Sequence, residues 1–320
     1  MNDRFNYYCL DKNSGFNKTT RENYERTCVD SLYWIQIKEN FEGLSEVLSR
    51  EFKTDPHICE SLTAEETRPR SYLKGNGILV ILRGVNLNPG ADPEDMVSIR
   101  LWIEPDKIIS VQNRKIMAVE DIIESIEDNN GPCSAGEFLC EISERLSVRM
   151  SDPLGIIDDS IDDLEDKITQ LKSEEVRSEI SSLRRQVIAL RRYLHPQRDA
   201  LKNLLILKIS WISEKEKMIL RDVSDRITRY IEDLDSGRER TAVARDELDS
   251  KNREQMNKIM YVFSIITVVF LPLGLITGLL GINVGGIPGS ENSYAFYFVC
   301  LCLGVILLIQ IYILRKIKWI

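Results

Sequence analysis

The chain has 320 residues and a formal net charge of −8, with 42 Lys and Arg against 50 Asp and Glu. This acidic balance disfavours a nucleic-acid partner and is compatible with a protein that handles cations. The seven cysteines are scattered and form no CxxC pair, which is typical of a reducing compartment.

Residues 1–150 are expected to form an α+β domain. The first ten residues carry neither the apolar core of a secretory signal nor the pattern of a transit peptide, so we expect no targeting segment. Runs rich in Ile, Val, Leu and aromatic residues predict strands, and apolar periodicity between and after them predicts helices. The strands are expected at 31–37, 77–86, 97–103 and 108–112, and the helices at 44–52, 119–127 and 136–150.

A region of long helices is expected at 151–258. Between 154 and 207, apolar residues recur at heptad-like spacing among charges, which predicts long paired helices, with Pro196 interrupting one or lying just past its end. From 213 to 281 there is one proline, Pro272, and no strong helix stop. A single helix of about 100 Å is therefore expected to form a stalk that continues into the membrane.

Two membrane-spanning helices are predicted at 259–281 and 294–314. No charged residue occurs between 259 and 290, and each run supplies the ~20 mostly apolar residues that a span needs. Lipid offers the backbone no hydrogen-bond partners, so both segments must be helices. The alternative, two buried core helices, would demand too large a core for one soluble domain.

The charges that flank the spans predict their orientation. The loop at 282–293 has no Lys or Arg, whereas the stalk end and the tail at 315–320 are basic. The positive-inside rule then places both termini in the cytoplasm, making 1–150 a cytoplasmic domain and the loop periplasmic or extracellular. The expected location is a bacterial inner (plasma) membrane, with the lipid bilayer as one partner.

One face of the first span carries mostly small or polar residues. They recur at spacings of three and four, which places them on one side of a helix, while bulky aliphatic residues fill most other positions. This small-residue stripe consists of Asn257, Met260, Ser264, Thr267, Leu271, Gly274, Gly278 and Gly281.

The stripe has two interpretations. It is either a seam where helices pack closely, or the lining of an ion path. Two spans cannot enclose a path, so the second interpretation requires a symmetric oligomer. Met260 and Leu271 would then be candidates for an apolar constriction.

The span ends in Gly281-Ile282-Asn283. A ring of Asn283 carbonyls at a pore mouth would bind a hydrated cation transiently, without a permanent charge to trap it. Glu291 would add an outer acidic ring that raises the local cation concentration. In the alternative, Gly281 is only a helix C-cap and Asn283 a loop residue.

The stretch FLPLGLITGLLGINVGGIPG at 270–289 resembles the CorA family of divalent-metal transporters, whose hallmark is Gly-x-Asn at the end of the first span. The GIN version with its Val-Gly-Gly-Ile-Pro-Gly sequel resembles the zinc-transporter (ZntB-like) branch more closely than the magnesium branch. Two further segments are similar to that branch: ETRPR at 66–70 and RRYLHPQR at 191–198.

The resemblance implies a funnel-shaped homopentamer in which the first span lines the pore and the second faces lipid. Gly281, Ile282 and Asn283 would form the selectivity filter at the entrance, and the cargo would be Zn²⁺, with uptake coupled to protons. Positions that line the pore in the family fall on Asn257, Met260, Leu271 and Gly274.

Other functions remain open. A magnesium or cobalt channel of the CorA type is one alternative, and a membrane-anchored helical scaffold or sensor is another. The acidic cluster at 158–166 is either a solvated helix face or a site of cation attraction or metal sensing in the cytoplasmic domain. His57 and His195 are the only histidines, so no resident metal or other cofactor is predicted, and no motif indicates an enzyme.

Overall fold

The computed structural model describes residues 4–11, 15–21, 32–170, 173–282, 287, 289, 292–317 and 319. The chain divides into two compact units, Met1–Arg245 and Asp246–Ile320. Helix α8 (Glu214–Leu280) runs through the boundary between them. The predicted boundary near Met150 falls between α5 and α6, inside the first unit.

The first unit contains a seven-stranded mixed sheet with the order β2-β1-β3-β7-β6-β5-β4. The central pair β3 and β7 is parallel, and every other neighbouring pair is antiparallel. The strands are β1 (Phe5–Asp11), β2 (Gly15–Thr19), β3 (Tyr33–Ile37), β4 (Arg70–Lys74), β5 (Gly77–Gly84), β6 (Val97–Ile103) and β7 (Lys107–Gln112).

The four predicted strands correspond to β3, β5, β6 and β7, which are the buried interior of the sheet. The structure adds β1, β2 and β4, which sequence analysis did not predict. These three strands lie toward the two edges of the sheet, where the chain need not be continuously apolar. The β4–β5 hairpin turns at Gly75, whose φ of 61° lies in the left-handed region that glycine adopts without strain.

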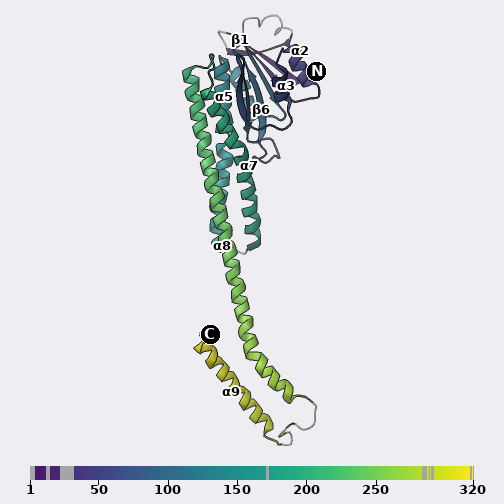
Figure 1. Ribbon diagram of the computed structural model, residues 1–320, viewed down its shortest axis with the longest axis vertical. Coiled ribbons are helices and arrows are strands. Elements are labelled where there is room, and N and C mark those ends of the chain that lie inside the picture. The colour runs from purple at the N-terminus through teal and green to yellow at the C-terminus, as the bar shows by residue number, and fades with distance from the viewer. Residues whose placement is uncertain are drawn as a thin grey trace. The chain divides into compact units, whose positions relative to one another are not determined.

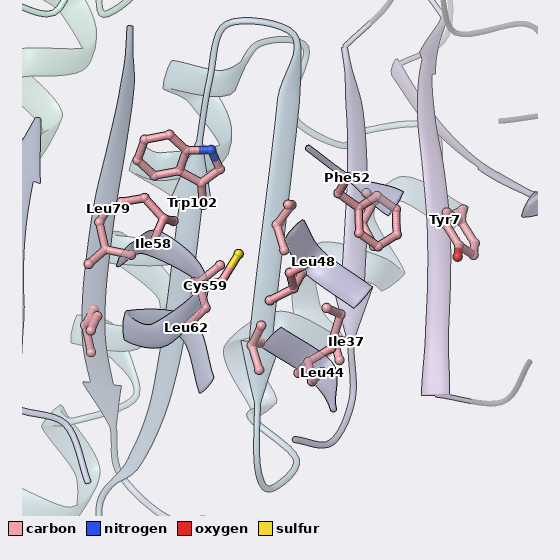
Figure 2. Packing of buried hydrophobic residues seen from close by; sticks show 14 residues of the cluster. Tyr7, Ile37, Leu44, Leu48, Phe52, Ile58, Cys59, Leu62, Leu79 and Trp102 are labelled. Carbon is pink, nitrogen blue, oxygen red and sulfur yellow. The ribbon is translucent and has the colours of Figure 1, made fainter. Parts of the chain in front are cut away.

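Two short helices cover one face of the sheet, α2 (Leu44–Glu51) and α3 (Pro56–Thr63). Figure 2 shows their apolar side chains against the strands, with Leu44 and Leu48 from α2 and Ile58, Cys59 and Leu62 from α3. Alternate strand residues complete this core: Tyr7, Ile35, Ile37, Leu79, Ile81, Trp102, Ile109 and Val111. Burying side chains of this size supplies about 1.5–3 kcal/mol each, which fixes the register of the sheet.

The opposite face is covered by α4 (Met117–Glu127) and α5 (Ala135–Val148). Trp34 lies at the centre of this layer, with its ring centroid 4.6 Å from that of Tyr8 and 4.9 Å from that of Phe138. Its indole Nε1 donates to the hydroxyl of Ser110 at 2.8 Å, so the buried N–H is satisfied.

Long helices follow, α6 (Ser151–Gln170), α7 (Ser173–Ile206) and α8. Within the first unit they run side by side away from the sheet (Figure 1). Helix α7 is joined to the sheet edge because the Ser71 hydroxyl donates to the Ala200 carbonyl at 2.7 Å. The predicted long paired helices and the single helix over 213–281 are confirmed, and Pro196 lies inside α7.

The second unit consists of the rest of α8 and α9 (Ala295–Lys316). The two helices are antiparallel, since Tyr261 lies near Trp319, with ring centroids 6.5 Å apart, while Val268 lies near Gln310. Both helices are long and apolar enough to cross a membrane. Their most apolar windows are 0% and 6% buried, so among the described residues neither window is covered as a core helix would be.

Candidate ion path on the first membrane-spanning helix

The small-residue stripe lies on the face of α8 that α9 leaves uncovered. The less exposed residues of the span are Ile265, Val269, Pro272, Leu273 and Ile276. These lie about half a turn around the helix from the stripe, and α9 packs on their side. Every residue of the stripe, in contrast, is exposed: Asn257, Met260, Ser264, Thr267, Leu271, Gly274, Gly278 and Gly281.

Two glycines of the stripe, Gly274 and Gly278, have no packing partner among the described residues. A Cβ placed on either would have no described heavy atom within 4 Å beyond the neighbouring backbone of its own helix. A glycine inside a helix costs about 1 kcal/mol relative to alanine, and packing against α9 does not account for that cost here. The interpretation as a seam between the two spans of one chain is therefore excluded; a seam with another copy or an ion path remains.

The hydroxyl of Thr267 adds polarity to the stripe without charge. Its Oγ1 donates to the carbonyl oxygen of Phe263 at 2.8 Å, so its hydrogen is committed to the helix. A hydroxyl oxygen that donates its hydrogen retains lone pairs, and these can accept from the water shell of a passing cation. Such a surface favours a hydrated cation without trapping it.

The end of α8 is closed by backbone hydrogen bonds. The N–H of Gly281 donates to the carbonyls of Thr277 at 2.9 Å and Gly278 at 3.2 Å. A Cβ at Gly281 would lie 3.2 Å from the Thr277 oxygen, so this glycine permits a close approach. Ile282 follows with an exposed side chain, whereas Asn283 and Glu291 lie outside the described residues.

The two segments ETRPR (66–70) and RRYLHPQR (191–198) meet at Arg83 of β5. Its guanidinium donates to the Thr67 carbonyl, at 3.2 Å from Nε and 2.9 Å from Nη2, and lies 4.0 Å from the ring centroid of Tyr193. The backbone N–H of Arg83 donates to Oε1 of Gln197 at 2.7 Å. Burial lowers the pKa of Arg83. Arg70, at the end of ETRPR, donates to the Ser61 hydroxyl at 3.2 Å. Through Arg83, the segments ETRPR and RRYLHPQR thus join the sheet to α7.

One face of the acidic cluster is paired with Arg240 of α8. Its guanidinium forms ion pairs with Asp158 at 3.1 Å, with Glu165 at 2.8 Å and with Asp162. The hydrogen bonds that Arg240 donates to Glu165 and Asp162 raise its pKa, and the Glu165 carboxylate contributes most. Within the described ranges, no group of three or more His, Cys, Asp or Glu is arranged to hold a metal ion.

Cys59, two residues after His57 in the sequence, is buried in the core, and its thiol contacts the Thr54 carbonyl.

These features define a class of protein. It is an integral membrane protein with an α+β unit and two apolar helices, the first of which continues a long helix and carries a polar stripe. The sequence profile of the family described as CorA-like Mg²⁺ transporter protein matches residues 29–316, and the chain belongs to this family. The activity of this family is the transport of divalent metal cations across a membrane.

Individual relatives agree with this assignment. The chain is 39% identical over 263 residues to the divalent cation transporter CmaX of Pseudomonas aeruginosa, covering 82% of this chain and 79% of the relative. It is 33% identical to the zinc transport protein ZntB of Pectobacterium atrosepticum, covering 93% and 89%.

Solved structures confirm the predicted fold of the single chain. Full-length CmaX superposes with a TM-score of 0.85 at 33% identity, covering 100% of this chain and 99% of that one. The CorA magnesium transporter from Methanocaldococcus jannaschii superposes with a TM-score of 0.83 over the whole of both chains. At 20% identity, that second likeness establishes the shared fold alone.

Proposed function

We propose that the protein takes up Zn²⁺ across a bacterial inner membrane, through a central path formed by five copies of α8. The observation that carries the proposal is the exposed small-residue stripe, which α9 does not cover. Five such faces around one axis would enclose a path lined by hydroxyl groups, glycines and two apolar positions. The second spans would lie outside, against lipid.

The chemistry of this path suits a hydrated divalent cation. The stripe has no charged side chain, so an ion keeps most of its water and is not held at a deep binding site. Met260 and Leu271 would narrow the path with apolar side chains, which resist wetting and act as a gate. At the outer mouth, Gly281, Ile282 and Asn283 would form the filter and Glu291 an acidic ring.

Zinc is favoured over magnesium by the nature of the relatives and by the filter sequence. Relatives at 31–35% identity carry the name zinc transport protein, and the GIN stretch resembles their branch. The family's description names Mg²⁺, so a magnesium channel is the second candidate. Proton coupling would distinguish a zinc importer from a passive channel. No resident cofactor is part of the proposal.

The test is uptake of Zn²⁺ and Mg²⁺ into proteoliposomes, with and without an inward proton gradient. Gly274→Leu should block uptake, because five leucines would fill the path. Gly304→Leu on α9 is the matched control, since a Cβ there also meets nothing within 4 Å. It should leave uptake unchanged. Asn283→Ala tests the filter in the same assay.

Each result has a distinct meaning. Zinc uptake that rises with the proton gradient and is lost in Gly274→Leu supports the proposal. Uptake that favours Mg²⁺ and ignores the gradient would assign the protein to the channel alternative. No uptake of any divalent cation would support the scaffold alternative, and equal losses in both glycine variants would refute a path along the stripe.

A further inference from the structure

Pro272 leaves one backbone carbonyl of the first span without its helical partner. In an α-helix, the N–H of each residue donates to the carbonyl four residues earlier. Proline has no N–H, so the carbonyl of Val268 is the one that Pro272 leaves without a donor. The proline ring also presses against that carbonyl and bends the helix. In hydrocarbon no water is available to replace the lost bond, so another group must donate.

The threonines nearest to this carbonyl are committed elsewhere. Thr267 donates to the carbonyl of Phe263, and Thr277 donates to those of Leu273 at 3.0 Å and Gly274 at 3.1 Å. The donor that reaches Val268 comes from the other span. Nε2 of Gln310 lies 3.5 Å from the Val268 oxygen.

Gln310 is unusual on its own helix. It is the one amide side chain in α9, in a segment otherwise made of aliphatic, aromatic, cysteine and glycine residues up to Arg315. It lies on the less exposed face of α9 with Leu303, Ile306, Leu307 and Leu314. An amide on a membrane helix is retained where it bonds to a neighbouring helix, because lipid offers it no partner. Gln310 therefore faces the bend in α8.

We infer that Gln310 is a positioning residue for transport, which bonds the carbonyl freed by Pro272 and thereby fixes the bend of the pore-lining helix. The inference rests on the proposed function of the stripe. Leu271 and Gly274 flank Pro272, so the angle at this bend sets how far each projects toward the path. The second span thus acts on the path without lining it.

The experiment is a double-mutant cycle between positions 310 and 272. Gln310→Leu keeps the size of the side chain and removes the donor, whereas Pro272→Ala restores the backbone N–H that Val268 lacks. In the wild-type background, Gln310→Leu should lower Zn²⁺ uptake in proteoliposomes by about 3- to 10-fold. In the Pro272→Ala background, the same replacement should change uptake less than about twofold. Gln310→Met serves if the leucine variant does not fold.

Thermal unfolding of the four proteins in detergent is the second readout. It should show the same pattern, because Gln310→Leu should lower the melting temperature in the wild-type background and leave it unchanged in the Pro272→Ala background. If wild type transports no cation, the proposed function fails while this coupling still tests the hydrogen bond. Unchanged uptake in Gln310→Leu, or an equal loss in both backgrounds, would overturn the positioning role even in an active transporter.

Discussion

The guanidinium of Arg240 donates to both carboxylate oxygens of Glu165, at 2.8 Å from Nε to Oε1 and at 2.9 Å from Nη2 to Oε2. Two more carboxylates of α6, Asp158 and Asp162, bond to the same group. The three acids are spaced by four and three residues, so they share one face of α6. This face of the acidic cluster is therefore a tether between α6 and α8.

Arg240→Ala should destabilise the helical part of the first unit. A bidentate network of partly exposed side chains contributes about 1 kcal/mol, because solvent screens it. The melting temperature of the full chain in detergent should fall by a few degrees. Arg238→Ala removes the same charge two positions away and is the control. Equal shifts in both variants would show that net charge, not the tether, is responsible.

The same tether predicts a pH dependence. The hydrogen bond from Arg240 lowers the pKa of Glu165 below its ordinary value. A carboxyl group with a lowered folded pKa stabilises the fold above its unfolded pKa of about 4.3, and this contribution is lost as pH falls through the folded pKa. The difference in melting temperature between wild type and Arg240→Ala should thus be constant at pH 6–8 and shrink below about pH 4. A difference that grows on acidification would contradict the assignment.

Arg83→Ala should destabilise the first unit more strongly. Its guanidinium donates to two backbone carbonyls, of Thr67 and of Met96 at 2.6 Å, and packs on Tyr193. Hydrogen bonds from a charged, half-buried donor contribute about 1.5–3 kcal/mol, and the loss leaves the Thr67 carbonyl without this donor. Arg83→Lys should recover only part, since lysine lacks the planar fork. Arg114→Ala, at an exposed position, is the control in chemical denaturation.

The elements that sequence analysis predicted are those whose apolar pattern is strong within their own segment. Helix α8 has an unbroken periodicity and the membrane spans have no charges, so neither depends on distant partners. The strands it missed are different. RSYLK in β4 is an edge strand in which only Ser71 is buried, and its apolar content is too low to stand out. Helix α3 is short, although Asp55 as N-cap followed by Pro56 is a helix-start signal that could have revealed it.

The candidate site divides in the same way. The stripe is a property of one helix, so spacing alone located it, and the structure adds which face α9 covers. The bond between Gln310 and Val268 joins residues 42 positions apart, and it depends on the register between two helices. Spacing within either helix cannot specify that register. Arg240 and its partner Glu165 on α6 are 75 positions apart, so sequence analysis could not predict this pairing for the same reason.

The orientation of the spans can be tested with reporter fusions at the C-terminus. The predicted cytoplasmic tail at 315–320 begins with Arg315 and Lys316, which lie in the last turn of α9. A fused green fluorescent protein should fluoresce and a fused alkaline phosphatase should be inactive, because each folds only on its own side of the bacterial membrane. Tyr261 and Trp319 lie together at this end of the two helices, as expected for one interface. Phosphatase activity would instead place the C-terminus outside the cytoplasm and contradict the predicted orientation.

Leu271→Ser should increase cation flux. The side chain is 69% exposed in the single chain and lies on the stripe next to Pro272, where five copies would form the apolar constriction. Serine removes the bulk and lets water enter, which lowers the barrier to a hydrated ion; tenfold faster uptake corresponds to about 1.4 kcal/mol. Leu308→Ser on α9, a position 67% exposed, makes the same change on the helix predicted to face lipid. Its uptake should match wild type, so a gain in both variants would indicate a general leak instead of an opened constriction.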